Sequence, residues 1–365
     1  MGLGLKYYPY ASLDFIIGKD GALYFLEANA VSGGLFYTMK LAEHVVKCRP
    51  DLREHFEDQL RIIDLFIQLC EDYCSRSGSD MRKVAIAVPE RWNAYMGMER
   101  RAIRDRFGEL GYKAFFVRKS EARYRGDLLC LGDEVPDLVV RRAFRFPVGI
   151  AQPVVNPSEA GLGTENKWRT YSLVSEALKD FKLVKLPRTI LARRREDLEE
   201  FLAERGEAVV KPLRSYGGKG VKLVKSCDEV SEWPVLVQER IEVPPLFLDS
   251  GRLRNFDLRV YVFDGEVVGA HLRTCPRSLS SCFVSNVSLG GNLVPVALCG
   301  EELRLERIEG LVLRYPKRDI VIEGSLLMLG EELSRELREA SKRIVEAIDR
   351  GVVEMVKKRR VHPRR

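Results

Sequence analysis

The spacing of hydrophobic and polar residues changes several times along the chain, and each change predicts a different element. Residues 13–17 and 22–28 form two short apolar runs separated by Gly18–Gly21, which predicts a β-hairpin with Asp-Gly at its turn. From residue 38 to residue 74 the apolar positions take a helical period, and Pro50 divides this stretch into two predicted helices. A helical extension is therefore expected to follow the hairpin.

The next part of the chain alternates between strands and a helix. A polar stretch at residues 75–80 is the best candidate for a linker. Beyond it, a buried strand, an amphipathic helix and two further strands are predicted at residues 83–88, 98–110, 113–117 and 138–141. This alternation is typical of a parallel sheet. No GxGxxG sequence follows the first strand, so a dinucleotide site is not expected there.

The second half predicts a unit that is richer in strands. A helix is expected over residues 166–178 and a long helix over residues 331–356. Between them lie predicted strands at residues 208–211, 221–224, 236–238, 258–263 and 267–272. The expected fold class is therefore α/β, with α+β lobes in the second half.

Length and composition indicate how many lobes the chain can form and in which compartment the protein is expected. The 365 residues, 45% hydrophobic and 31% charged, suffice for two or three packed lobes of an ordinary soluble protein. No apolar run of about 18 residues predicts a membrane helix, and the start lacks the pattern of a secretory signal. A cytoplasmic protein without membrane partners is the expectation. The eight cysteines form no CxxC pair, which argues against zinc and favours reduced thiols.

The net charge of +7 leaves two interpretations open. Much of the excess lies in the basic tail, residues 357–365, and at Arg193–Arg195. Nucleic-acid binding is one interpretation, but no aromatic residues interleave with the tail. Cations at the negative end of a helix dipole are the simpler interpretation, so a nucleic-acid partner is not expected.

A glycine-rich loop in the second half has the features of a phosphate site. Lys211 ends a predicted strand, and the following loop carries Ser215, Gly217, Gly218 and Gly220 before the next strand begins. Glycine lets backbone N–H groups approach phosphate oxygens closely, and a lysine neutralises their charge. The loop lacks the GK[ST] ending of a Walker A motif, and a strand rather than a helix follows it.

Further motifs surround this loop in a fixed order. They are NKWRTY at residues 166–171, LPRT at 186–189, VLVQERI at 235–241, DLRVYV at 257–262, and then Arg273, Asn286 and Gly290-Gly291. As a set, between about residues 166 and 295, they resemble the ATP-grasp family, especially its branch of glutathione synthases and RimK-type ligases. The resemblance implies a two-lobed grip that closes on ATP. It also implies that Lys167 and Lys211 contact phosphates beneath the glycine-rich loop, and that Glu239 and the backbone near Ile241 face the adenine.

The resemblance also implies groups that act on the transferred phosphate. Arg259 and Arg273 would stabilise that phosphate and an acyl intermediate, and Asn286 would lie near the substrate or metal. The substrate itself is not specified. Arg141 and Arg142 end a predicted strand and have two open interpretations, contact with an acidic substrate or a surface ion pair.

The metal ligands of the family belong after its last helix, but this chain has none there. Asp319 and Glu323 precede the long helix, which is the wrong place. The N-terminal hairpin instead resembles the ATP-grasp metal hairpin, with Asp14, Glu27 and Asn29 as the implied Mg²⁺ ligands. Asp14 and Glu27 lie on paired strands, and Glu27 and Asn29 are two residues apart, so these oxygen-bearing side chains are expected to converge.

Placing the N-terminal hairpin after the C-terminal helix restores the family's order, which predicts a circularly permuted ATP-grasp fold. Two alternatives remain open. In one, the chain is a tandem protein whose first ATP-grasp domain has lost its front, and in the other the hairpin completes the site of a partner subunit. One departure limits the resemblance, because some relatives carry an arginine where this chain has Ser12.

The expected organisation has four parts. Residues 1–75 supply the metal hairpin and helical extension, residues 81–160 resemble the small α/β domain that precedes ATP-grasp lobes, residues 161–356 form those lobes, and a basic tail follows. The resemblance implies an ATP- and Mg²⁺-dependent ligase that joins a small-molecule carboxylate to an amine through an acyl phosphate. A small-molecule kinase and a non-catalytic nucleotide-binding or nucleic-acid-associated protein are the alternatives, and a homodimer is possible.

Overall fold

The computed structural model describes most of the chain. The described residues are 5–31, 33–90, 94–215, 218–244, 246–247, 253–275, 291–314 and 319–361. The predictions for Gly217, Asn286 and Gly290 lie outside them.

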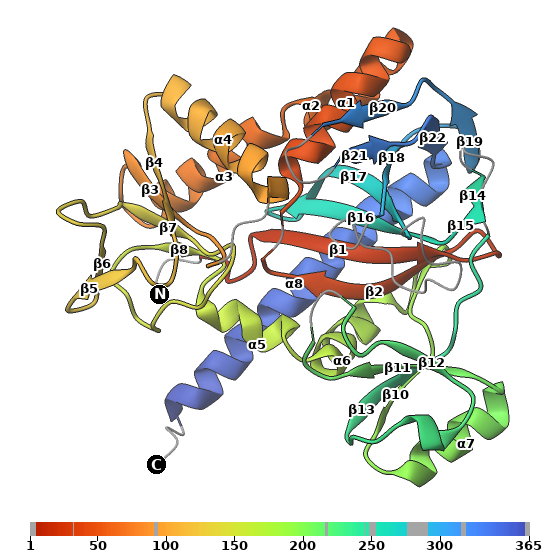
Figure 1. Cartoon of the computed structure of the whole chain (residues 1–365). Helices are drawn as coiled ribbons and strands as arrows, with labels where there is room; N and C mark the ends of the chain where they lie inside the picture. Colours follow the sequence, from red (N-terminus) through yellow and green to blue (C-terminus); the bar gives the residue numbers. More distant parts are fainter. Residues whose placement is uncertain are drawn as a thin grey trace.

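A ten-stranded sheet, here called the main sheet, forms the centre of the molecule (Figure 1). Its strands follow the order β19-β22-β18-β17-β16-β1-β2-β9, with β21 and then β20 attached at β18. The bounds are β1 (Tyr10–Ile17), β2 (Leu23–Asn29), β9 (Val184–Lys185), β16 (Phe256–Phe263), β17 (Glu266–Thr274), β18 (Leu293–Ala297), β19 (Arg304–Arg307), β20 (Leu311–Leu313), β21 (Ile320–Ile322) and β22 (Ser325–Met328). The first strands of the chain thus lie inside a sheet built mainly from its last third.

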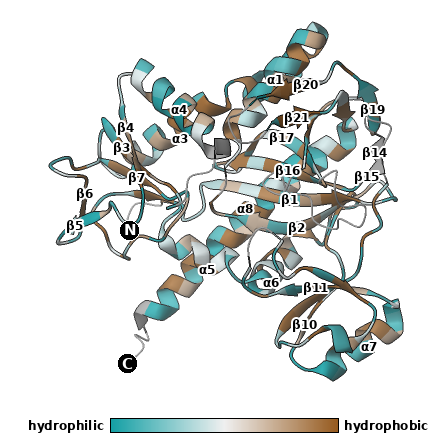
Figure 2. Cartoon of the chain, viewed as in Figure 1, coloured by the Kyte–Doolittle hydropathy of each residue, from teal (hydrophilic) through white to brown (hydrophobic). Residues whose placement is uncertain are grey.

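Helices cover both faces of the main sheet. On one face, α8 (Glu331–Val361) packs against α6 (Lys167–Leu178) and the short α5 (Gly161–Thr164), which follows η2 (Ser158–Ala160). Leu13 and Phe15 of β1 point into the core on this side, where they join apolar residues of α8. Tyr10 belongs to the core on the other side, with Phe66. Figure 2 shows the apolar strands of the main sheet between helices whose outer surfaces are polar.

The second face is covered by the helical extension. It consists of α1 (Leu35–Cys48), η1 (Pro50–Phe56), α2 (Glu57–Leu60) and α3 (Ile62–Arg76). Pro50 begins the short 3-10 helix, as its missing N–H permits at a helix start. Cys70 and Cys74 are both buried on α3. α3 continues to Arg76, so the first two residues of the predicted linker are helical.

A small α/β unit, residues 83–156, lies beside this helical layer. Its parallel sheet has the order β4-β3-β7-β8, which confirms the parallel pairing predicted from the strand–helix alternation. A separate hairpin, β5 and β6, projects from it. The bounds are β3 (Lys83–Ala87), α4 (Ala94–Glu109), β4 (Lys113–Val117), β5 (Arg123–Arg125), β6 (Leu128–Cys130), β7 (Leu138–Val140) and β8 (Val154–Val155).

A third part, the lower lobe, spans residues 189–238 and lies below the main sheet in Figure 1. Its antiparallel sheet has the order β10-β13-β11-β12 and its own apolar core. The bounds are β10 (Thr189–Ala192), α7 (Arg195–Arg205), β11 (Ala208–Pro212), β12 (Lys222–Val224), η3 (Cys227–Glu229) and β13 (Val235–Gln238). A short hairpin, β14 (Leu246–Phe247) and β15 (Leu253–Arg254), follows it. The predicted α/β class with α+β lobes is confirmed.

Two expectations need correction. Arg141 and Arg142 are 3% and 9% exposed, so they form neither a surface ion pair nor an open substrate contact. Arg142 pairs with the buried Glu99, and Arg141 Nε donates to the carbonyl oxygen of Asn156 at 2.7 Å. The long helix continues to Val361, so the first residues of the expected basic tail are helical. Within the described residues, no helix is long and apolar enough to cross a membrane.

Candidate nucleotide and metal site

The hairpin of β1 and β2 brings the predicted metal ligands together in the middle of the main sheet. β1 pairs antiparallel with β2 on one side and with β16 on the other, so Asp14 lies opposite both Glu27 and Arg259. Ser12 lies opposite Asn29. Because residues two apart on a strand share a face, Asp14, Glu27, Asn29 and Arg259 project to the same side of the sheet.

Two arginines enclose Asp14. The Nε and Nη2 groups of Arg259 donate to its two carboxylate oxygens, both at 2.8 Å, and Arg273 Nη2 donates to Asp14 Oδ2 at 3.0 Å. Burial by itself raises the pKa of a carboxyl group, but the charges of Arg259 and Arg273 outweigh it and hold the pKa of Asp14 well below its usual range. Asp14 is therefore ionised at neutral pH.

Two buried groups that the sequence analysis gave no role extend this network. Arg273 also donates to both oxygens of Asp257, at 2.7 and 2.8 Å. Burial raises the pKa of Asp257 to about 6, although the charge of Arg273 opposes it. Burial and the two arginines hold the pKa of His271, which lies opposite Arg259, well below its ordinary value. The sequence signal that could have identified Asp257 and His271 is an ionisable residue inside an otherwise apolar strand.

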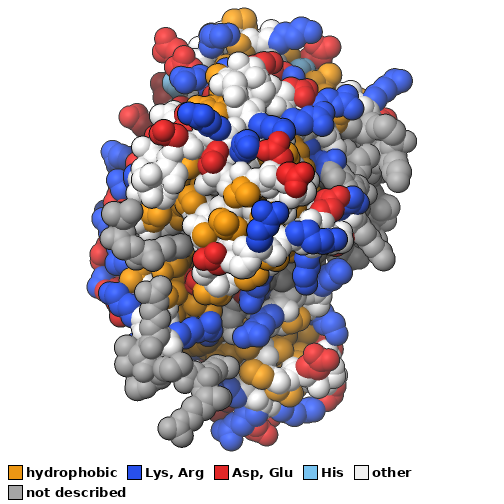
Figure 3. Space-filling view, turned by 90° about the vertical axis from the view of Figure 1, so that its left-hand side faces the viewer, with side chains coloured by type: hydrophobic (Ala, Val, Ile, Leu, Met, Phe, Trp, Pro, Cys, Tyr) orange, Lys and Arg blue, Asp and Glu red, His pale blue; other side chains and the backbone are white. Residues whose placement is uncertain are grey.

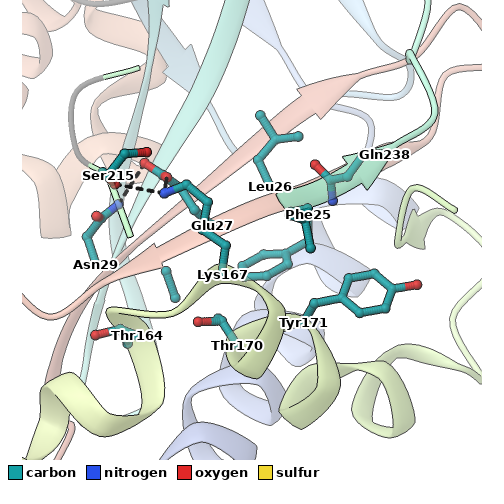
Figure 4. A pocket seen from close by; sticks show the side chains of 12 residues that line it. Phe25, Leu26, Glu27, Asn29, Thr164, Lys167, Thr170, Tyr171, Ser215 and Gln238 are labelled. Atoms are coloured by element: carbon teal, nitrogen blue, oxygen red, sulfur yellow. Dashed lines mark hydrogen bonds and ion pairs between the residues drawn. The ribbon is translucent and has the colours of Figure 1, made fainter. Parts of the chain in front are cut away.

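Lys167 joins the hairpin to the glycine-rich loop (Figure 4). Asn166 caps α6, which makes Lys167 the first residue of that helix. Lys167 Nζ donates to the carbonyl oxygen of Ser215 at 2.9 Å and lies 3.4 Å from Glu27 Oε2. Asn29 Nδ2 donates to the other oxygen of Glu27 at 3.3 Å. The lysine predicted to bind phosphate thus lies next to the carboxylate predicted to bind metal.

Lys211 enters the same space from the lower lobe. It lies near the end of β11 and lines, with Asp14, Glu27 and Asn29, a cavity of about 490 Å³ between the main sheet and the lower lobe. Figure 3 shows that the surface narrows between the lower lobe and the rest of the molecule. Burial lowers the pKa of Lys211 to about 8, although the negative charge of Glu27 opposes this shift. Gly218 lies in the left-handed region, at φ 74°, which a glycine adopts readily.

Residues that follow β13 also line the cavity. Glu239 and Ile241 line it, and Glu239 Oε1 accepts a hydrogen bond from the Arg188 N–H at 2.7 Å, so the adenine contact stays a prediction. Glu242, which the sequence analysis did not single out, pairs with Lys19 in the hairpin turn at 2.6 Å. This ion pair connects the main sheet to the segment that leaves the lower lobe.

The donor set of Asp14, Glu27 and Asn29 fits a hard cation. All three offer oxygen, the ligand atom that Mg²⁺ prefers, from adjacent positions on one face of the hairpin. Among the described residues no cluster of three His, Cys, Asp or Glu side chains that could hold a metal occurs. A cation bound beside Asp14 and Glu27 would therefore take further ligands from Asn29 or from a nucleotide. Few protein ligands and several phosphate ligands are typical of magnesium sites.

Comparison with known proteins adds two findings. The sequence of residues 177–349 matches the family described as prokaryotic glutathione synthetase, ATP-grasp domain. The fold matches the crystal structure of a protein from Methylobacillus flagellatus KT, proposed to be a γ-glutamylcysteine synthetase, with a TM-score of 0.61 at 14% identity over 96% of this chain and 90% of that one. Just under half of the chain is thus similar to an ATP-grasp domain.

Two curated proteins that are similar to part of this chain carry the names of a ligase and a synthetase. It is 27% identical over 157 residues, 40% of this chain and 50% of the relative, to the coenzyme γ-F420-2:α-L-glutamate ligase of Methanococcus maripaludis. It is 29% identical over 129 residues, 34% of this chain and 38% of the relative, to the glutathione synthetase of Gloeobacter violaceus. The chain thus spans half or less of the length of these relatives.

Proposed function

We propose that this chain is an ATP-grasp ligase that uses ATP to form a C–N bond between a small-molecule carboxylate and an amine. The observation that carries the proposal is that Asp14, Glu27, Lys167 and Lys211 line one cavity, although 140 residues of sequence separate Glu27 from Lys167. The curated relatives support it, because their names are those of carboxylate–amine ligases.

Each group has a proposed task. Lys167 and Lys211 bind phosphate oxygens, and the glycine-rich loop covers them with backbone N–H groups. Asp14, Glu27 and Asn29 would hold Mg²⁺, and the ion would supply the positive charge that neutralises the polyphosphate.

The proposed reaction has two steps. A substrate carboxylate oxygen takes the γ-phosphoryl group of ATP, which gives an acyl phosphate and ADP. The amine nitrogen then attacks the acyl carbon, phosphate leaves with the C–O bonding pair, and the nitrogen loses a proton to give an amide. Arg259 and Arg273 stabilise the charge on the transferred phosphate, so catalysis rests on position and electrostatics rather than on a nucleophilic side chain.

We infer in addition that the chain is circularly permuted relative to the family. Two observations support this inference. The family match begins at residue 177 and ends at residue 349, so it leaves out the hairpin that carries Asp14 and Glu27. The carboxylate of Asp349 in α8 accepts hydrogen bonds from the backbone N–H groups of Tyr7 and Tyr8, at 2.6 and 3.0 Å, which ties the C-terminal helix to the start of the hairpin.

Calorimetric titration with a non-hydrolysable ATP analogue, with and without Mg²⁺, tests the proposed site. We expect Lys211→Ala to weaken binding under both conditions, and Glu27→Gln to weaken it only with Mg²⁺. Lys222→Ala is the matched control, because Lys222 is an exposed lysine on the strand next to that of Lys211. If Glu27→Gln binds as the parent does with Mg²⁺, the hairpin is not the metal site.

Turnover distinguishes the reaction from its alternative. A ligase with its carboxylate substrate releases phosphate and, with hydroxylamine as the amine, gives a hydroxamate. A kinase gives a stable phosphorylated product and no hydroxamate. The second outcome would contradict the ligase proposal while leaving the nucleotide site intact.

A further inference from the structure

Asn156 connects the small α/β unit to the open end of the metal hairpin. It follows β8, is fully buried, and has a φ of 54°, in the left-handed region that asparagine tolerates better than most residues. Its side chain contacts Tyr10, the first residue of β1, and Ala30, the residue after β2. More than a hundred residues of sequence separate these contacts.

The side-chain amide of Asn156 bonds to the backbone on both sides of the hairpin, beyond the last direct pair of β1 and β2. Its Oδ1 accepts from the Tyr10 N–H at 3.2 Å, while its Nδ2 donates to the carbonyl oxygens of Tyr10 at 2.5 Å and Ala30 at 2.6 Å. The last direct pair of the hairpin at this end is Ser12 with Asn29. One side chain therefore holds both strands at the position next to Asn29, a proposed metal ligand.

A second buried group of the small unit holds the chain shortly after Asn29. Glu99 in α4 is fully buried, and its Oε2 accepts from the N–H groups of Gly34 at 2.6 Å and Phe36 at 3.2 Å, at the start of α1. Its other oxygen pairs with Arg142. Anions are favourable at a helix start, and the buried arginine offsets the cost of burying the carboxylate.

We propose that Asn156 and Glu99 are positioning residues that set the geometry of the Glu27–Asn29 metal edge, an inference that rests on the proposed function. The chain that follows Asn29 is held at two points, at Ala30 by Asn156 and at Gly34 by Glu99. Neither group lines the cavity itself. The small α/β unit therefore acts on the site through the backbone of the hairpin.

The direction of the effect follows from where each half of the site is anchored. Asn29 and Glu27 depend on the held segment, whereas Lys211 belongs to the lower lobe, which has a separate core. Groups that orient metal ligands change metal affinity by about 10- to 100-fold when they are removed. Loss of Asn156 is therefore expected to raise the Mg²⁺ requirement and to leave Mg²⁺-free binding of the analogue unchanged.

The test of this proposal compares the variant Asn156→Gly with the control variant Gln152→Ala. Glycine deletes the side chain and still tolerates the positive φ at this position. Gln152 is a matched control because it is also a buried amide of the small unit that bonds to a backbone N–H and carbonyl, both of Leu129, but it does not touch the hairpin. Hydrogen–deuterium exchange of ligand-free protein and Mg²⁺ titration at fixed analogue are measured on both variants.

The expected result is faster exchange at residues 23–36 and an Mg²⁺ half-saturation raised about tenfold in Asn156→Gly, with neither change in Gln152→Ala. Glu99→Gln should act in the same direction, and it decides the question if Asn156→Gly fails to fold. Parental exchange at residues 23–36 in the variants, or an equal Mg²⁺ shift in Gln152→Ala, overturns the proposal.

Failure of the metal assignment would look different. If Glu27→Gln leaves Mg²⁺ dependence unchanged while Asn156→Gly still accelerates exchange at residues 23–36, the proposed metal site is wrong. The contact of Asn156 then orders the hairpin without positioning a metal ligand, and the inference falls for that separate reason.

Discussion

At the scale of single residues, the site is a network in which buried acidic and basic side chains pair with one another. Asp14 and Asp257 share Arg273, and Asp14 also holds Arg259. Removing one member of such a group leaves an uncompensated buried charge, so the four side chains stabilise one another only as a set. The same two guanidinium groups that neutralise Asp14 face the cavity, where a polyphosphate would compete for them.

Lys211 gives the site a predicted pH dependence. In the free protein its pKa is about 8, because burial disfavours the cation. A bound polyphosphate favours the cation and raises that pKa, so binding above pH 8 requires proton uptake. Affinity for the analogue should then be constant below about pH 7.5 and fall by about tenfold by about pH 9.

Calorimetry at about pH 8.5 in two buffers of different ionisation enthalpy measures the uptake directly. Lys211→Arg is the control, since arginine stays charged throughout this range and should bind without taking up a proton. The phosphates of the analogue are already ionised there. Equal uptake by the parent and by Lys211→Arg would assign the proton to another group.

Some residues of the site could be predicted from the sequence and others could not, for a physical reason. Asp14, Glu27 and Asn29 lie on one hairpin, so their spacing fixes which face they share. The β-bulge between Asp14 and Phe15 gave no sequence signal. The burial of Arg142 could not be predicted, because two adjacent arginines after a short strand carry the same pattern whether exposed or buried, and burial depends on distant elements.

At the scale of elements, the position of Lys167 depends on a close approach between helices. Gly163 in α5 lies against α8, and a β-carbon there would meet Ile348 Cγ2 at 2.8 Å and Val352 Cγ2 at 3.0 Å. These branched side chains have little rotational freedom on a helix. α5 directly precedes Asn166 and Lys167, so a shift of α5 moves the start of α6.

Gly163→Ala should therefore destabilise the protein by about 1–3 kcal/mol, since overpacking forces the two helices apart. Gly108→Ala is its matched control: Gly108 is also helical, but nothing lies within 4 Å of the position that a β-carbon would take there. At Gly108 alanine should add about 0.5–1 kcal/mol of stability through helix propensity. Denaturant unfolding measures both, and a Gly163→Ala variant as stable as the parent would show that α5 adjusts without strain.

Elements with strong local periodicity were predicted well, but the strands with which they pair were not. The strands at residues 83–88 and 113–117 and the helix at 166–178 agree with β3, β4 and α6 within about a residue or two. The order of the main sheet joins β1 to β16 across some 240 residues of sequence, and no local pattern specifies such a pairing. Short edge strands such as β19 and β20 were also missed.

At the scale of the whole molecule, the question is whether each chain builds its own site. β1 lies between β2 and β16 of the same chain, and Asn156 of that chain holds its open end. For a partner subunit to supply Asp14 and Glu27, these pairings would have to be broken and remade between chains. A hairpin in the middle of a sheet makes such an exchange costly, because every lost strand contact must be recovered.

Co-expression of the Glu27→Gln and Lys211→Ala chains distinguishes the two arrangements. If each chain builds its own site, every site carries one defect, and Mg²⁺-dependent analogue binding should stay at the level of the separate variants. If two chains exchange hairpins in a symmetric dimer, half of the randomly formed dimers are mixed and have one intact site each, so about a quarter of parental binding should return. Co-expression of parent and Lys211→Ala chains shows how much binding an intact chain gives at this ratio. Recovery of about a quarter would reject the site within one chain, and with it a permutation that completes the fold in a single subunit.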